Sequence, residues 1–217
     1  QEAWEICQRQ NGLCMYTGDK LIFAKSNKEK FRGVETASIE RLDTNSSYNK
    51  DNICWVHKDI NFSRGNIPIS EFIYLAQMVS QPDVSNYILT IPELKMKNNW
   101  KGSKLLGLSY VNKLKAEAKR RNITFNTNIG ELWQLFLKQN GRCYYTNLPL
   151  IMSPYTNDKL NNTASVDRVD SQLDYSISNL VWCHKKVNRM KQEYSERYFK
   201  EICTKIHNNS ENIKINL

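Results

Sequence analysis

Two stretches of the chain repeat one another, and this duplication constrains the fold more than any other feature. Residues 37–61 read ASIERLDTNSSYNKDNICWVHKDIN and residues 164–188 read ASVDRVDSQLDYSISNLVWCHKKVN, with ten of the 25 positions identical. A second match lies upstream of each, where QNGLCMYT at 10–17 returns as QNGRCYYT at 139–146. The repeat unit of about 127–129 residues is far longer than a solenoid repeat. The sequence therefore predicts a duplicated domain.

The length of 217 residues suits two small domains. The duplication places them near residues 1–80 and 105–217. The connector between them, residues 81–104, contains two prolines and little apolar periodicity, so we expect an irregular linker. The chain has no apolar run of about 18 residues, so no membrane-spanning segment is expected.

The charge points to a polyanionic partner. The net charge is +9 and the isoelectric point is about 9.2. Five cations gather in residues 110–122, on a segment whose apolar stripe predicts a helix: Lys113, Lys115, Lys119, Arg120 and Arg121. The exposed cations of such a helix could bind a phosphate backbone, although many helix faces that only contact solvent have a similar charge pattern.

The six cysteines include no C-x-x-C pair, so a structural zinc ion is not expected. Only Cys14 and Cys143 recur between the copies, which favours buried free thiols over a disulfide framework. We therefore expect an intracellular protein, from the cytoplasm of a bacterial or phage-infected cell, an organelle or a nucleus.

The residue pattern predicts an α+β fold with the same order of elements in both copies. A helix is expected at residues 127–139, ending at an Asn-Gly stop. The remaining elements of the second copy are a short strand at 148–152, strands at 164–169 and 180–183, and helices at 184–191 and 196–207. The last helix has a counterpart at 71–79 in the first copy.

The order of elements and the repeated polar residues resemble the HNH endonucleases, the family with the ββα-metal fold. The family motif has Asp-His on the first strand, Asn at the start of the second strand, and Cys-x-x-Cys-Asn on the helix. The second copy places Asp167-Arg168, Asn179 and His184-Lys-Lys-Val-Asn188 at these positions, and the first copy places Glu40-Arg41, Asn52 and His57-Lys-Asp-Ile-Asn61. The subgroup most similar is the phage and viral type that reads SLDRID, NVxWVH and NxMK. The resemblance covers most of the second copy and about two-thirds of the first.

This resemblance implies two tandem ββα-metal modules with flanking helices, related by a pseudo-two-fold axis. It also implies Mg²⁺, for which Mn²⁺ could substitute, because hydrolysis of a phosphodiester needs a cation that neutralises the phosphoryl charge. The implied metal ligands are Asp167 and Asn188 in the second copy, and Glu40 and Asn61 in the first. The implied DNA contacts, besides the five helix cations, are Arg64, Lys185, Arg189 and Lys191.

The sequence departs from the family pattern at the general base. Arg41 and Arg168 stand where the family keeps a histidine, and a guanidinium cannot accept a proton in a protein. These arginines could instead bind the scissile phosphate. Three proton acceptors stay open: the carboxylates of Asp43 and Asp170, the imidazoles of His57 and His184, and a metal-bound hydroxide. We expect the histidines to form hydrogen bonds where the family binds zinc rather than to act in catalysis, and Trp55 and Trp182 to lie in the core.

The leading functional hypothesis is a metal-dependent endonuclease of restriction, homing or phage type that cuts double-stranded DNA. One chain would act as a monomeric pseudo-dimer with a site in each repeat, or with one active site and one that mainly binds DNA. The alternatives are a DNA-binding protein on a degenerate nuclease fold, which the missing histidine favours, and an RNA-directed nuclease.

Overall fold

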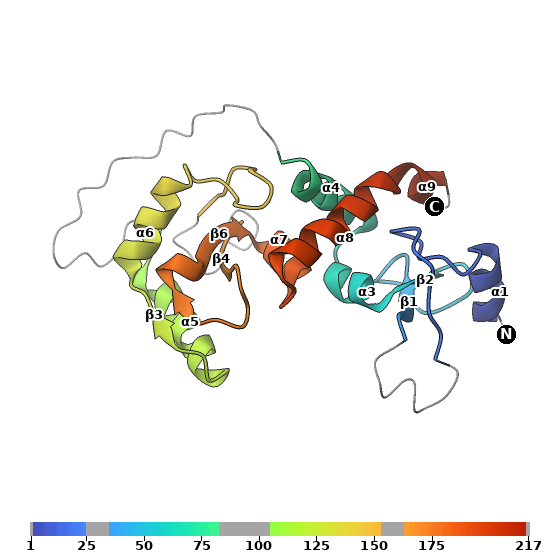
Figure 1. The fold of residues 1–217 in the computed structure, drawn as a ribbon, viewed down its shortest axis with the longest axis horizontal. Coiled ribbons are helices and arrows are strands. Elements are labelled where there is room, and N and C mark those ends of the chain that lie inside the picture. The colour runs from blue at the N-terminus through green and yellow to red at the C-terminus, as the bar shows by residue number, and fades with distance from the viewer. Residues whose placement is uncertain (1, 25–34, 83–104, 153–162, 216–217) are drawn as a thin grey trace. The chain divides into compact units, whose positions relative to one another are not determined.

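The fold is mixed α+β, and the computed structural model describes residues 2–24, 35–82, 105–152 and 163–215 (Figure 1). Most of the expected linker, residues 83–104, lies outside the described residues. The chain divides into two units, one of residues 1–80 with 197–217 and the other of residues 81–196. Within the described ranges, no helix is long and apolar enough to cross a membrane.

The first unit contains one antiparallel hairpin and the helices around it. Its elements are α1 (Glu2–Arg9), β1 (Ala37–Arg41), β2 (Ile53–His57), α3 (Lys58–Arg64), α4 (Ile69–Ser80), most of α8 (Glu196–Asn208) and α9 (Ser210–Ile215). Helix α3 starts directly after β2 and packs against both strands.

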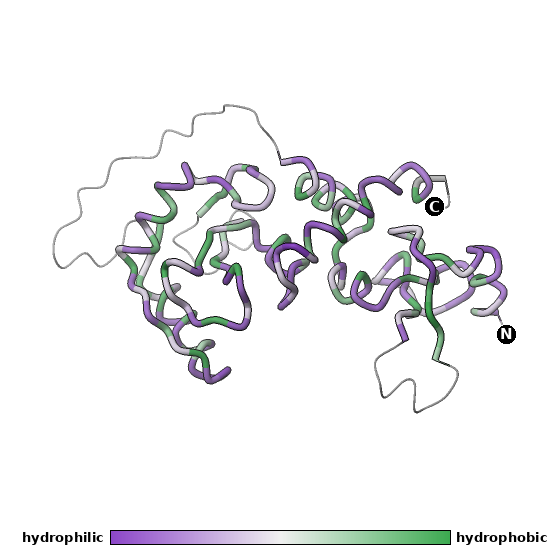
Figure 2. The backbone as a smooth tube through the Cα atoms, in the orientation of Figure 1, coloured by the Kyte–Doolittle hydropathy of each residue, from purple (hydrophilic) through white to green (hydrophobic). Residues whose placement is uncertain are grey.

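The second unit repeats the hairpin and adds a helix before it. Its elements are α5 (Leu108–Arg120), β3 (Phe125–Asn126), α6 (Ile129–Lys138), β4 (Ala164–Arg168), β5 (Tyr175–Ser176), the 3₁₀ turn η1 (Ile177–Asn179), β6 (Leu180–His184) and α7 (Lys185–Lys191). Strand β6 is hydrophobic along most of its length, whereas α7 is mainly hydrophilic (Figure 2). The hairpin therefore supplies the core, and α7 carries polar side chains over it.

The two hairpins have the same register. Ala37 pairs with His57 in the first unit, and Ala164 pairs with His184 in the second. The expected strand at 148–152 is wrong, because the structure has only an isolated bridge between Arg142 and Pro149.

The repeated glutamine explains why each hairpin keeps its place beside the preceding helix. Gln139 follows α6, and its Nε2 donates to the Trp182 carbonyl oxygen while its Oε1 accepts from the Trp182 backbone N–H, both at 2.8 Å. Gln10 forms the same two bonds with Trp55 at 2.8 Å. One side chain in each copy thus satisfies both backbone groups of a strand residue.

The Asn-Gly pair after each of these glutamines reverses the chain. Asn140 and Gly141 have φ of 52° and 63°, and Asn11 and Gly12 have φ of 53° and 68°. Asparagine and glycine tolerate this left-handed backbone better than other residues, which is why the pair marks the helix end in the sequence.

Helix α8, which follows the second hairpin in the sequence, lies in the first unit, whereas the sequence led us to assign residues 105–217 to one module. Its apolar face is buried at Phe199, Ile202 and Ile206. The Ser80 hydroxyl lies 3.3 Å from that of Thr204, which connects the end of α4 to α8.

Helix α8 makes polar contacts with residues of the first copy that have no chemical equivalent in the second copy. The Tyr198 hydroxyl donates to Asp59 at 2.7 Å, and Lys205 Nζ donates to Asp19 at 2.9 Å. By alignment of the repeats, the second copy has Lys186 in place of Asp59 and Leu148 in place of Asp19. The first copy therefore offers the hydrogen-bond acceptors that these side chains of α8 need.

Candidate functional site

A groove of about 390 Å³ in the second unit runs over the start of the hairpin and α7. Its lining includes three residues expected at the reaction centre and three expected to contact DNA: Asp167, Arg168, Asn188, Arg121, Lys185 and Arg189. These residues come from α5 or its end, β4 and α7. The fold thus brings residues separated by more than sixty positions to one concave surface.

Helix α5 reaches this groove because it is fastened to the hairpin. The Tyr110 hydroxyl accepts from the Val166 N–H at 3.0 Å, and the Tyr110 ring stacks on Trp182. The Trp182 side chain is itself buried and donates from Nε1 to the Leu132 carbonyl, as expected of a core residue. In the first unit, Trp55 is half-buried and donates from Nε1 to the Ala3 carbonyl at 2.5 Å.

The amide of Asn188 has a defined orientation. Its Nδ2 donates to Ser165 Oγ and to the Val166 carbonyl, both at 3.0 Å. Because the NH₂ group faces these two acceptors, Oδ1 is the atom left for a ligand. Asn61 repeats this arrangement in the first unit, where Nδ2 donates to Ser38 Oγ at 2.9 Å and to the Ile39 carbonyl at 3.0 Å.

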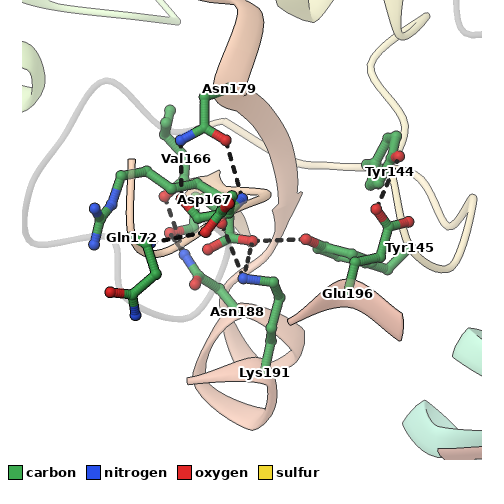
Figure 3. Close-up of polar contacts among 12 residues, drawn as sticks. Tyr144, Tyr145, Val166, Asp167, Gln172, Asn179, Asn188, Lys191 and Glu196 are labelled. Carbon is green, nitrogen blue, oxygen red and sulfur yellow. Dashed lines mark hydrogen bonds and ion pairs between the residues drawn. The ribbon is translucent and has the colours of Figure 1, made fainter. Parts of the chain in front are cut away.

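The carboxylate of Asp167 has two side-chain partners of its own. Lys191 Nζ lies 3.2 Å from Oδ2, and the Tyr145 hydroxyl donates to the same oxygen at 2.7 Å (Figure 3). Burial raises the pKa of Asp167, and the contacts with Lys191 and Tyr145 oppose that rise. Lys191 is fully buried and also donates to the Arg168 carbonyl at 2.9 Å.

The first unit builds the same pair from different residues. Arg64 is buried and forms an ion pair through Nη1 with Oε1 of Glu40. Its guanidinium also donates to the carbonyls of Arg41 at 2.9 Å and Leu42 at 2.8 Å. Burial raises the pKa of Glu40 to about 7, against the lowering effect of Arg64.

Arg64 and Lys191 were expected to contact DNA, and their burial contradicts this expectation. Their side chains are 1% and 0% exposed, and each neutralises a carboxylate inside its unit. A buried cation that is already paired cannot reach a phosphate on the surface. The sequence position of these residues, at the end of a short helix in each copy, does not indicate burial.

The arginines at the family's histidine position hold the hairpin loops. Arg168 donates from Nη1 to the Leu173 carbonyl, and its guanidinium lies 5.0 Å from the centre of the Tyr175 ring. Arg41 repeats both contacts, with the Ser46 carbonyl at 2.9 Å and the Tyr48 ring at 5.0 Å. Tyr48 and Tyr175 are themselves a matched pair, and the sequence analysis gave them no role.

The two aspartates proposed as bases cap turns. Asp43 accepts from the Asn45 N–H at 2.9 Å and from the Ser46 hydroxyl at 2.8 Å, and these bonds hold its pKa below the usual value. Asp170 accepts from the Gln172 N–H at 2.9 Å and does not line the groove. A general base works best with a pKa near the operating pH, so the lowered pKa of Asp43 disfavours that role.

The asparagine that opens the second strand ties the loop together. Asn179 accepts from the Asp170 N–H at 3.0 Å and donates to the carbonyls of Asp170 and Asp174. Asn52 forms the corresponding bonds with Asp43 and Ser47.

The two histidines cap helices beside the repeated cysteines. His184 Nδ1 accepts from the Lys186 N–H at 3.2 Å, and the His184 N–H lies 3.3 Å from Cys143 Sγ. His57 has the same relation to Asp59 and Cys14, each at 3.2 Å. Burial lowers the pKa of His57. Both histidines thus have a structural role as helix caps, and His184 does not line the groove of the second unit.

All six cysteines are free and buried, and the burial agrees with the expectation drawn from their poor recurrence between the copies. The remaining cations of α5, namely Lys113, Lys115, Lys119 and Arg120, are exposed but do not line the groove. Arg121 lines it and forms an ion pair with Glu193 at 2.5 Å. The structure therefore brings one of the five helix cations to the site.

The second unit fits an oxygen-ligated divalent ion better than the first. Mg²⁺ prefers oxygen ligands and keeps several waters, so a carboxylate and an amide oxygen in one groove suit it. Asp167 and Asn188 meet this description, with Lys191 as the counter-ion of the carboxylate. In the first unit, the guanidinium of Arg64 holds Glu40 and is itself fixed by two carbonyls.

Compared with known proteins, the chain matches no family model, no curated protein and no solved structure. The resemblance to HNH endonucleases therefore rests on the motif residues of this sequence.

Proposed function

We propose that the chain is a metal-dependent endonuclease for double-stranded DNA, composed of two ββα-metal modules, in which the second module carries out hydrolysis. The observation that carries this proposal is the groove that Asp167 and Asn188 share with Arg121, Lys185 and Arg189. A phosphodiesterase needs oxygen ligands for a cation beside positive charges for the DNA backbone.

The exposed cations of the groove would hold the phosphates on either side of the scissile bond. Lys185 and Arg189 lie on α7, and Arg121 lies at the end of α5. Arg168 is buried like Arg64 and Lys191 and uses one of its five N–H donors for the Leu173 carbonyl, but unlike them it lines the groove, where a remaining donor could meet a phosphate.

Asp167 and Asn188 would hold the ion. A bound Mg²⁺ or Mn²⁺ would neutralise charge on the phosphoryl oxygens. Ser165 fixes the Asn188 amide so that its oxygen is available to the groove without rearrangement. Such preorganised oxygen ligands lower the cost of binding a hard cation.

We assign the first module no hydrolysis, because Arg64 already holds Glu40, and a smaller share of the DNA binding. Helix α3 carries Asp59 and Phe62 at the positions where α7 carries Lys186 and Arg189. This side of the first module therefore supplies less positive charge for a phosphate backbone. One chain would hold double-stranded DNA with both modules and cut one strand at a time with the second.

A second candidate is a DNA-binding protein without hydrolytic activity. Two observations favour it: arginine replaces the family's histidine in both copies, and an internal cation neutralises each carboxylate. The same groove would then bind phosphates through its cations alone.

Incubation of supercoiled plasmid with Mg²⁺, Mn²⁺ or EDTA separates these candidates when DNA binding is measured in parallel by gel shift. The endonuclease predicts nicked circles with either metal, none in EDTA, and a retained gel shift in EDTA. Binding without cleavage under all conditions would support the second candidate. A preference for cutting folded RNA over DNA would instead favour the RNA-directed alternative.

A further inference from the structure

A buried cation sits on the carboxylate of each module. Arg64 and Lys191 each follow the module's asparagine by three residues, at the end of α3 and α7. Their side chains are almost fully buried, and each contacts the residue expected to bind metal. A carboxylate buried without a counter-charge is costly, so these cations stabilise the modules when no metal is bound.

The two cations are anchored differently. The guanidinium of Arg64 donates to the carbonyls of Arg41 and Leu42 as well as pairing with Glu40. Its planar fork is therefore held at three acceptors. Lys191 Nζ has one carbonyl acceptor, that of Arg168, besides the carboxylate of Asp167. A flexible ammonium with fewer anchors moves more easily than a clamped guanidinium.

The groove of the second unit is lined by the residue that carries the carboxylate, although only 7% of this side chain is exposed. Asp167 and Asn188 line it, whereas Lys191 does not and approaches Asp167 from the end of α7 (Figure 3). An ion entering from the groove would thus meet the two oxygen ligands and compete with the ammonium for Asp167.

We propose that Lys191 and Arg64 are internal counter-cations that set metal occupancy: a divalent ion exchanges with Lys191 in the second module, and Arg64 keeps the first module closed to metal. This inference rests on the proposed metal-dependent function, and it adds that one chain binds one ion. The ammonium on Asp167 weakens metal binding in the second module, and the guanidinium on Glu40 prevents it in the first.

Titration of the full chain with Mn²⁺, followed by the loss of the free-ion electron paramagnetic resonance signal, tests this proposal without measuring cleavage. Wild type should bind one Mn²⁺ per chain. Lys191→Arg should bind it about 10–100-fold more weakly, because the site gains an anchored counter-ion. Lys191→Met should bind it more tightly by a similar factor, and Arg64→Lys should add a second, weaker ion.

Lys186→Met is the matched control, because Lys186 is an exposed lysine on the same helix, and it should bind Mn²⁺ as wild type does. Circular dichroism checks that each variant is folded. If Lys191→Met unfolds, the conservative changes Lys191→Arg and Arg64→Lys still decide. Two ions of equal affinity in wild type, or unchanged affinity in Lys191→Arg, would overturn the proposal.

The combined results of Mn²⁺ binding and plasmid nicking distinguish a failure of this inference from a failure of the proposed endonuclease function. If wild type nicks plasmid with Mn²⁺ and Lys191→Arg binds and nicks equally well, the exchange is wrong and the endonuclease stands. If plasmid is never cut but Lys191→Met gains Mn²⁺ affinity over wild type, the endonuclease is wrong and the counter-cation role stands.

Discussion

Asp167 and Glu40 occupy equivalent positions in the two repeats, and a different cationic side chain neutralises each carboxylate. Lys191 serves the aspartate, and Arg64 serves the longer glutamate. The repeat, together with the resemblance to the HNH motif, singled out both carboxylates and both asparagines. It did not reveal their partners, because burial of a cation depends on how a helix end packs and not on the local pattern.

The Glu40 carboxyl should make the first unit less stable as the pH rises. Its pKa is raised from 4.5 to about 7 by burial, so the folded protein binds this proton more tightly than the unfolded chain. The contribution of Glu40 to the free energy of unfolding is therefore greatest below pH 4.5 and falls as the pH rises to about 7. Glu40→Gln should flatten this part of the pH dependence in urea unfolding. Glu2→Gln, an exposed control, should keep the wild-type slope, and a Glu40→Gln profile equal to wild type would contradict the assignment.

Arg168 should matter to the hairpin loop as well as to cleavage. Its guanidinium lies over the Tyr175 ring and donates to the Leu173 carbonyl, and lysine lacks the planar group that makes both contacts. We expect Arg168→Ala to reduce nicking on the order of 10²-fold and Arg168→Lys to reduce it less. Amide hydrogen exchange in residues 169–175 should be faster in both variants. Unchanged exchange in Arg168→Ala would show that the loop does not depend on this side chain.

At the scale of elements, periodicity predicted most helices and strands to within one or two residues. The expected helix at 127–139 is α6 (Ile129–Lys138), and the expected strand at 180–183 is β6 (Leu180–His184). The parallel pair of β3 and β5 was not predicted, because two-residue strands carry no period. The prediction of a strand at 148–152 was wrong for a related reason. The structure has an isolated bridge there, which pairs one residue with one partner and does not require an alternating pattern of apolar residues.

The glutamine after α6 should be the main polar link between this helix and the hairpin. Removing its side chain leaves the N–H and carbonyl of Trp182 without these partners. We expect Gln139→Ala to destabilise the second unit by about 1–3 kcal/mol, measured by hydrogen exchange of β4 and β6. Gln134→Ala, an exposed change on the same helix, should cost much less. Equal destabilisation by Gln139→Ala and Gln134→Ala would contradict the role of Gln139 as the main polar link.

At the scale of the whole molecule, the duplication predicted two units, but not the placement of the last helix. Helix α8 follows the second hairpin in sequence and belongs to the first unit in space. The contacts of Tyr198 and Lys205 with Asp59 and Asp19 offer the physical reason. An alignment of the repeats cannot reveal which unit contains α8, because it compares each segment with the equivalent segment of the other repeat and not with its neighbours in space.

A chain that ends at Glu196 should therefore lose the fold of its first unit. Phe199, Ile202 and Ile206 are buried, and each buried apolar side chain of this size contributes about 1.5–3 kcal/mol. Their sum is comparable with the total stability of a small domain, about 5–15 kcal/mol. Hydrogen exchange should show β1 and β2 unprotected in the truncated chain, while β4 and β6, the internal control, stay protected. Protection of β1 and β2 equal to that of the full chain would contradict the assignment of α8.

The most direct test compares the two asparagines in one assay. Asn188→Ala and Asn61→Ala remove the same side chain from equivalent positions, and supercoiled plasmid with Mg²⁺ reports single-strand cutting by each variant. We predict that Asn188→Ala lowers the nicking rate on the order of 10²-fold while its DNA binding in EDTA stays close to wild type. Asn61→Ala should nick at nearly the wild-type rate. Nicking that survives in Asn188→Ala, or that is lost equally in both variants, would contradict a single hydrolytic site in the second module.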